Sequence, residues 1–167
     1  RDPRLKASIY YDGSKLNLET GALLSTKTGG NCALDPSNAR YTCTGYYTRK
    51  FSHYKSGRSG NLDGYFKEFR LAELYLNYAE AANEASTTGT VPNDAVDAVN
   101  AVRSRVGMPG IPYGLSCDQF RLRIRNERRV ELAFEEHRFF DVRRWKMLDQ
   151  TDKVITGMKA NSDGSYS

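Results

Sequence analysis

Apolar positions in the second half of the chain recur at the spacing of an α-helix. Between residues 69 and 85 they fall three and four positions apart, which predicts an amphipathic helix. The side of this helix that we expect to face the core carries Leu71, Leu74, Tyr75, Tyr78, Ala82 and Ala85. A second helix is predicted to begin at Pro92 or Asn93, to bury a row of valines, and to end before Gly107 and Pro109. The two segments together predict a helical hairpin.

Two further helices are predicted downstream. The first begins near Ser116, because Gln119 follows at the spacing of a capping box, and runs to about residue 135. The second is short and covers residues 139–148. On the longer helix, four apolar residues share one arc: Phe120, Ile124, Val130 and Phe134.

Glu127 and Glu131 fall in the middle of that apolar arc. Because a carboxylate on a buried face needs a basic partner, the pattern predicts ion pairs with arginines of neighbouring segments. The expected partners are Arg103, Arg105, Arg143 and Arg144.

The first part of the chain follows a different pattern. Residues 1–65 show no helical period and are rich in turn formers, so we expect loops with short strands around residues 7–11 and 41–51. Residues 66–150 are the helical segment, and residues 151–167 form a polar tail whose end, NSDGSYS, is expected to be a loop that leads into something missing. A chain of 167 residues predicts a single domain with one core.

The charge pattern narrows the class of protein. The net charge is +5, and the acidic residues of the third helix alternate with its arginines instead of leaving a basic stripe. This favours ion pairing and argues against binding to nucleic acid. No apolar run approaches the roughly 20 residues that a membrane-spanning helix needs.

Four blocks of sequence resemble the SusD/RagB family of glycan-binding outer-membrane lipoproteins. The longest, NERRVELAFEEHRFFDVRRW, covers residues 126–145 and is similar to the C-terminal signature of that family. RLAELYLNYAEAANE at 70–84 and AVNAVRSRVGMP at 98–109 resemble the preceding helices of the family, in the same order, and DPRL at 2–5 resembles another element. The chain lacks the helical N-terminal half and the closing segment of a full-length member.

The resemblance implies a fold, a partner and a location. The fold is mainly α, with tetratricopeptide-like helical hairpins and an irregular N-terminal segment. The implied function is capture of an oligosaccharide or polysaccharide at the exterior face of the cell outer membrane, for a TonB-dependent SusC-like transporter. Only a lipid anchor on the missing N-terminal half would attach such a protein to the membrane. The alternative is a helical scaffold whose tyrosine-rich loops contact another protein.

Catalysis and metal binding find little support in the residues. Glu127 and Glu131 lie one turn apart, as an acid–base or metal-binding pair would, but no Glu-x-x-His partner occurs, and arginine pairing explains them better. His53 and His137 belong to no ligand cluster. Residues 61–64 and 161–164 offer oxygen ligands for calcium, yet turn chemistry explains both more simply. We therefore expect no catalytic residues, no metal and no cofactor.

Tyrosines of the irregular segment are the candidate ligand-binding residues: Tyr10, Tyr11, Tyr46 and Tyr47. An aromatic face can cover the C–H side of a pyranose, while neighbouring polar groups bind the hydroxyls. Packing of the loop onto the helices is the competing explanation for each of them. Tyr75 and Tyr78, on the apolar helix face, are expected in the core.

Three cysteines leave at least one thiol unpaired. Cys32 and Cys43 are expected to form a disulfide in the extracellular setting that the resemblance implies, although the sequence leaves two reduced thiols open. Cys117 lies at a predicted helix start without a nearby histidine, so we expect no catalytic role for it.

Overall fold

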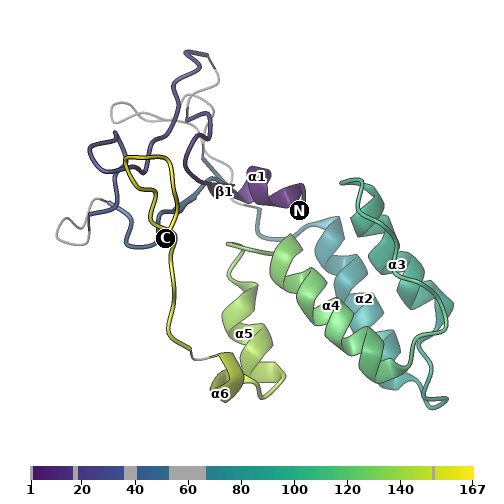
Figure 1. Ribbon diagram of the computed structural model, residues 1–167. Coiled ribbons are helices and arrows are strands. Elements are labelled where there is room, and N and C mark those ends of the chain that lie inside the picture. Colours follow the sequence, from purple (N-terminus) through teal and green to yellow (C-terminus); the bar gives the residue numbers. More distant parts are fainter. Residues whose placement is uncertain (1, 17–18, 36–40, 53–66, 152) are drawn as a thin grey trace. The chain divides into compact units, whose positions relative to one another are not determined.

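The chain folds into two compact units in the computed structural model, which describes residues 2–16, 19–35, 41–52, 67–151 and 153–167. Unit 1 consists of residues 1–4 and 67–146, and unit 2 of residues 5–66 and 147–167. Helix α1, Arg4–Ser8, contains the boundary between them. The elements are shown in Figure 1.

Unit 1 is helical, as the pattern of apolar positions predicts. Its helices are α2, Leu71–Ala85; α3, Asn93–Ser104; α4, Cys117–Glu131; and α5, His137–Arg144. The predicted capping box is present at the start of α4, where Ser116 Oγ accepts from the Gln119 N–H and Gln119 Oε1 accepts from the Ser116 N–H. Gly107 lies in the turn that follows the end of α3. Its φ of 68° is a left-handed conformation that glycine adopts without steric cost.

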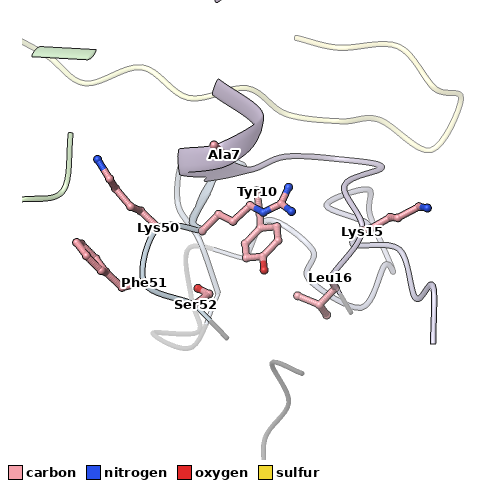
Figure 2. Close-up of a pocket in the computed structure, with 8 residues that line it drawn as sticks. Ala7, Tyr10, Lys15, Leu16, Lys50, Phe51 and Ser52 are labelled. Carbon is pink, nitrogen blue, oxygen red and sulfur yellow. The ribbon is translucent and has the colours of Figure 1, made fainter. Parts of the chain in front are cut away.

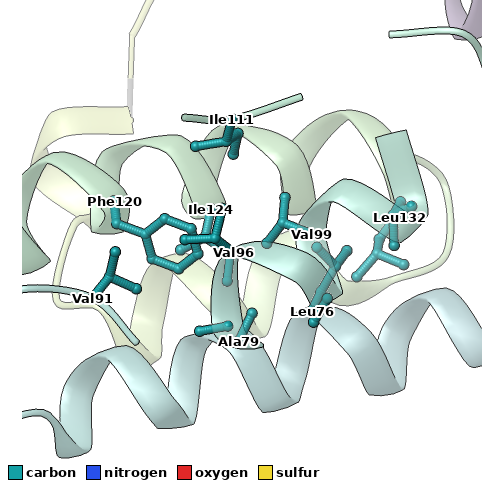
Figure 3. Packing of buried hydrophobic residues seen from close by; sticks show 12 residues of the cluster. Leu76, Ala79, Val91, Val96, Val99, Ile111, Phe120, Ile124 and Leu132 are labelled. Atoms are coloured by element: carbon teal, nitrogen blue, oxygen red, sulfur yellow. The ribbon is translucent and has the colours of Figure 1, made fainter. Parts of the chain in front are cut away.

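The core of unit 1 lies between α2, α3 and α4, and Figure 3 shows its packing. Phe120 and Ile124 of α4 are fully buried against a row of aliphatic residues from the other two helices: Leu76, Ala79, Val96 and Val99. The mainly helical fold with helical hairpins is therefore confirmed.

The predicted core-facing side of α2 is wrong for its large residues, whereas Ala82 does pack against the core. Leu71 is 61% exposed and Leu74, Tyr75 and Tyr78 are also exposed, so the two tyrosines are not core residues. The buried side of α2 carries Leu76, Ala79, Glu80 and Asn83. The buried side of the helix therefore combines two apolar residues with two polar ones, while four large apolar residues face outward. A prediction that ranks faces by hydrophobicity selects the opposite side.

Helix α4 ends four residues earlier than predicted. The guanidinium of Arg70 donates to the Glu131 carbonyl at 2.8 Å, which takes the place of the next intrahelical bond. Phe134 and Glu136 then adopt left-handed backbone conformations. Phe134 is consequently exposed instead of continuing the apolar arc of the helix.

Unit 2 contains little regular structure. Strands β1, Ile9–Tyr10, and β2, Tyr47–Thr48, pair antiparallel with Tyr10 opposite Tyr47, and both lie within the segments predicted to be strands. A short helix, α6, covers Leu148–Thr151.

The polar tail is an integral part of unit 2. The Met158 N–H donates to the Thr44 carbonyl at 2.8 Å, and a Cβ on Gly45 would lie 2.0 Å from the Met158 carbonyl oxygen. The two backbones approach this closely only because Gly45 and Gly157 have no side chain. Residues 159–167 then turn back, with Lys159 and Ser167 exchanging backbone hydrogen bonds. These bonds close the loop that the sequence predicts at residues 161–167.

Candidate binding site

Glu127 lies at the centre of an ion-pair cluster in unit 1. Its side chain is 2% exposed, and its two oxygens lie 2.5 Å from Arg4 Nη1 and 2.6 Å from Arg103 Nη1. Arg4 is itself held by Asp2 at 2.7 Å. Of these partners, the sequence pattern identified Arg103 only.

Glu131 is surrounded by three arginines. Its oxygens lie 3.0 Å from Arg4, 2.6 Å from Arg70 and 2.7 Å from Arg105. Burial by itself would raise the pKa of Glu131, but hydrogen bonds from Arg70 and Arg4 outweigh it and hold the pKa below the ordinary value. A carboxylate kept charged in this way, with its oxygens occupied by guanidinium groups, is poorly suited to donate or accept a catalytic proton.

The remaining two predicted arginines have other partners. Arg144 pairs with Glu80 and with Asp141, and Arg128 joins the same group through Asp141 at 2.9 Å. Arg143 lies over the Phe139 ring, 4.9 Å from its centre, and not beside Glu127 or Glu131. Arg143 and Arg144 both lie on α5, and the sequence does not specify where α5 packs along α4.

The disulfide expected between Cys32 and Cys43 stays a prediction. Cys43 is exposed and Cys32 is half-buried. The backbone of Cys32 is held in place, because its N–H donates to the Ser25 carbonyl at 3.0 Å and its carbonyl accepts from the Tyr47 hydroxyl at 3.3 Å.

A cavity of ≈ 310 Å³ opens beside β1 in unit 2. Figure 2 shows the Tyr10 ring between Lys15 and Leu16 on one side and Lys50, Phe51 and Ser52 on the other. Ala7 and Arg49 complete the lining. The volume is at the lower end of the range of roughly 300–1,000 Å³ for small-ligand sites, which fits one or two sugar units better than a long chain.

The wall formed by Arg49 to Ser52 is a tight turn that follows β2. Its N–H groups are fixed, since both Arg49 and Lys50 donate to the Ser8 carbonyl and Ser52 donates to the Arg49 carbonyl. Phe51 occupies this turn with a φ of 69°. Positive φ is rare for a bulky residue and costs of order 1–3 kcal/mol, and such strain gathers at binding and catalytic sites. The turn directs a 41% exposed phenyl ring to the cavity wall.

Only one of the four predicted tyrosines lines this cavity. Tyr10 does so although it is 6% exposed, and the Arg49 guanidinium lies 5.3 Å from its ring centre. Tyr46 and Tyr47 are half-buried, and their hydroxyls contact the Met158 sulfur at 3.8 Å and the Cys32 carbonyl. Tyr11 is also half-buried. Lys15, Arg49, Lys50 and Phe51 are not among the predicted site residues, although the last three lie within the segment 41–51 that is predicted to contain a strand.

A second hollow, of ≈ 490 Å³, lies on the exposed side of α2 and α3. Leu71, Leu74, Tyr75 and Tyr78 form one wall, and Tyr78 donates to Asp94 at 2.6 Å. It belongs to unit 1 and offers mainly apolar side chains.

Within the described ranges, no group of three or more His, Cys, Asp or Glu side chains is placed to hold a metal ion. The candidate calcium ligands at 61–64 and His53 lie outside those ranges, whereas 161–164 is a turn in which Asp163 accepts from the Ser165 N–H at 2.8 Å. No helix in the described part of the chain is both long and apolar enough to span a bilayer.

Comparison with known proteins identifies the family. The model of the SusD family matches residues 1–166, so the chain belongs to the SusD family. A SusD-like protein of Bacteroides fragilis has a crystal structure that matches the whole chain, with 34% sequence identity and a TM-score of 0.85. A SusD homolog of Bacteroides thetaiotaomicron matches 90% of the chain, with 30% identity and a TM-score of 0.59.

The chain spans only part of its relatives. It covers 32% of the Bacteroides fragilis protein chain in that structure. A SusD-like protein of Formosa agariphila is 40% identical over 83 residues, a stretch that makes up 48% of this chain and 15% of that protein.

Proposed function

We propose that this chain is part of a glycan-binding subunit of an outer-membrane nutrient uptake system. In this role it binds oligosaccharide at the cell surface and delivers it to a TonB-dependent SusC-like transporter. Membership of the SusD family supports the role, the transporter partner and the outer-membrane location. The observation that carries the binding site is the aromatic-lined cavity of unit 2.

The cavity has the two kinds of groups that sugar binding requires. The exposed ring of Phe51 offers a flat apolar face to the C–H side of a pyranose, and the Ser52 hydroxyl and the nearby cations can bind sugar hydroxyls. Tyr10 also lines the cavity, with the Arg49 guanidinium over its ring. Because β2 and the turn after it fix the backbone of Arg49 to Ser52, little order has to be gained on binding.

The proposed role is binding without cleavage. Glycoside hydrolysis needs two carboxyl groups on opposite sides of the scissile bond. Among the described residues that line the unit 2 cavity there is no Asp or Glu, and Glu127 and Glu131 are buried against arginines in unit 1. Incubation of the chain with an oligosaccharide that it binds should therefore release no reducing ends. A hydrolytic activity that co-purifies with the chain would refute a purely binding role.

Removal of the Phe51 ring should weaken binding. A stacked ring contributes about 0.5–1.5 kcal/mol beyond the area it buries, so Phe51→Ala should raise the dissociation constant of a bound oligosaccharide about fivefold. Isothermal titration calorimetry with a panel of neutral and acidic oligosaccharides measures the dissociation constants, which we expect in the micromolar to millimolar range.

Phe69→Ala is the matched control, because Phe69 is also exposed but lies in unit 1. It should leave the affinity unchanged. Equal affinity of the parent and the Phe51→Ala variant would remove the unit 2 cavity from the binding site.

A further inference from the structure

The unit 2 cavity is strongly cationic. Among the lining residues that the structure describes, Lys15, Arg49 and Lys50 carry a positive charge and none carries a negative one. The chain as a whole has 25 basic and 20 acidic residues, so its charges are nearly balanced elsewhere. The excess at the cavity is therefore a local feature.

Arg49 differs from the buried arginines of unit 1. Arg4, Arg70 and Arg128 each contact two or more carboxylates. Arg49 instead donates to the Lys6 carbonyl at 2.7 Å and lies over the Tyr10 ring, and no carboxylate in the described part of the chain forms an ion pair with it. Its guanidinium is thus held in place while most of its five donors stay available for a ligand.

The arrangement of these groups suits an acidic sugar better than a neutral one. A guanidinium binds a carboxylate or a sulfate through two parallel hydrogen bonds, and a lysine adds a point charge. Lys15 and Lys50 lie on opposite sides of Tyr10 with their amines extending away from the ring (Figure 2), so they add positive charge around the cavity while Arg49 lies at the ring itself. The Phe51 ring remains available for the apolar face of the same sugar.

We propose that this cavity binds the anionic group, carboxylate or sulfate, of an acidic oligosaccharide. The proposal rests on the proposed function and adds the substrate class. Arg49 binds the anionic group directly, Lys15 and Lys50 supply further positive charge, and Phe51 covers the ring. Because Lys15 is exposed, part of the attraction is screened by salt, and affinity falls as ionic strength rises.

Two matched pairs of oligosaccharides test the substrate class. One pair is an oligogalacturonide and its carboxyl-reduced counterpart, and the other is a sulfated galactan oligosaccharide and its desulfated counterpart. Calorimetry with the full 167-residue chain should give at least tenfold tighter binding of the acidic member in one pair. The pair that shows the preference tells whether the ligand group is a carboxylate or a sulfate.

Charge-removing variants locate the preference. Arg49→Gln and Lys15→Gln should each weaken binding of the acidic oligosaccharide at least threefold more than they weaken binding of its neutral counterpart. Lys15→Gln preserves the fold, since Lys15 is exposed. Lys159→Gln is the control, because it removes the same charge from an exposed position of unit 2 that does not line the cavity.

The outcomes separate this inference from the proposed function. Equal binding of acidic and neutral members, or an equal loss in the Lys159→Gln control, would overturn the inference and leave glycan binding intact. Failure of all four oligosaccharides to bind at millimolar concentration would overturn both.

Discussion

Glu131→Gln should destabilise unit 1 by about 3 kcal/mol, because a buried ion-pair cluster that loses one charge leaves its partners uncompensated. Glu131 is 3% exposed and accepts from Arg4, Arg70 and Arg105. The amide keeps the shape of the side chain but donates a hydrogen where a guanidinium needs an acceptor. In a thermal melt the midpoint of the unit 1 transition should fall by roughly 12–24 °C.

Glu136→Gln is the control, since Glu136 is exposed and only a few residues away. It should melt at the same temperature as the parent.

The stability lost in Glu131→Gln should also depend on pH. Because the pKa of Glu131 is depressed below 4.5 in the folded state, the charged side chain contributes fully to stability above pH 4.5. That contribution disappears as the pH falls through the lower pKa of the folded state. Urea unfolding should show parent and variant converging in acid, and a pH-independent difference would point to packing instead of charge.

Leu76→Ala should cost about 2–5 kcal/mol, because Leu76 is fully buried in the core of unit 1 and its truncation leaves a cavity. Leu71→Ala, the same change on the same helix, should cost no more than about 0.5 kcal/mol, since Leu71 is 61% exposed. Chemical denaturation of the two variants measures both values.

This pair of variants decides which side of α2 faces the core. A larger loss of stability in Leu71→Ala than in Leu76→Ala would indicate that the side predicted by hydrophobicity alone faces the core. It would contradict the packing between α2, α3 and α4. Equal, small costs would indicate that the helix is loosely packed on both sides.

The helices of unit 1 could be predicted from sequence, but the buried side of α2 could not. Capping residues and glycines are local signals, and they correctly place the start of α4 and the end of α3. The face of α2 depends on its partners: Glu80 is buried because Arg144 and the Trp145 indole N–H contact it. Hydrophobicity ranks such a residue as outward-facing, since the compensating groups lie more than sixty positions away.

The ion-pair cluster could be anticipated only in part. Glu127 and Glu131 stand out because they interrupt an apolar arc, and that signal lies within one helix. Arg4 and Arg70 are distant in sequence and carry no periodic signal, so nothing in the pattern assigns them to these carboxylates.

The cavity of unit 2 depends on tertiary contacts that leave little trace in sequence. The alternation of residues predicts where β1 and β2 lie, but not that the turn after β2 places Phe51 at positive φ beside Tyr10. Likewise, the backbone of residues 157–158 can lie against that of residues 44–45 only because Gly45 and Gly157 have no side chain. In the sequence these two glycines look like ordinary loop residues. Tyrosine content alone therefore points to the segment that contains this cavity, but to only one of the residues that line it, Tyr10.

The most direct test of the central claim, that the unit 2 cavity binds oligosaccharide, is a titration of the ¹⁵N-labelled chain followed by amide chemical shifts. With an oligosaccharide that binds in calorimetry, the account predicts the largest saturable shifts at the cavity: Tyr10, Lys15, Arg49, Phe51 and Ser52. Saturable shifts confined to α2 and α3 around Tyr75 and Tyr78, with the cavity residues unmoved, would contradict it.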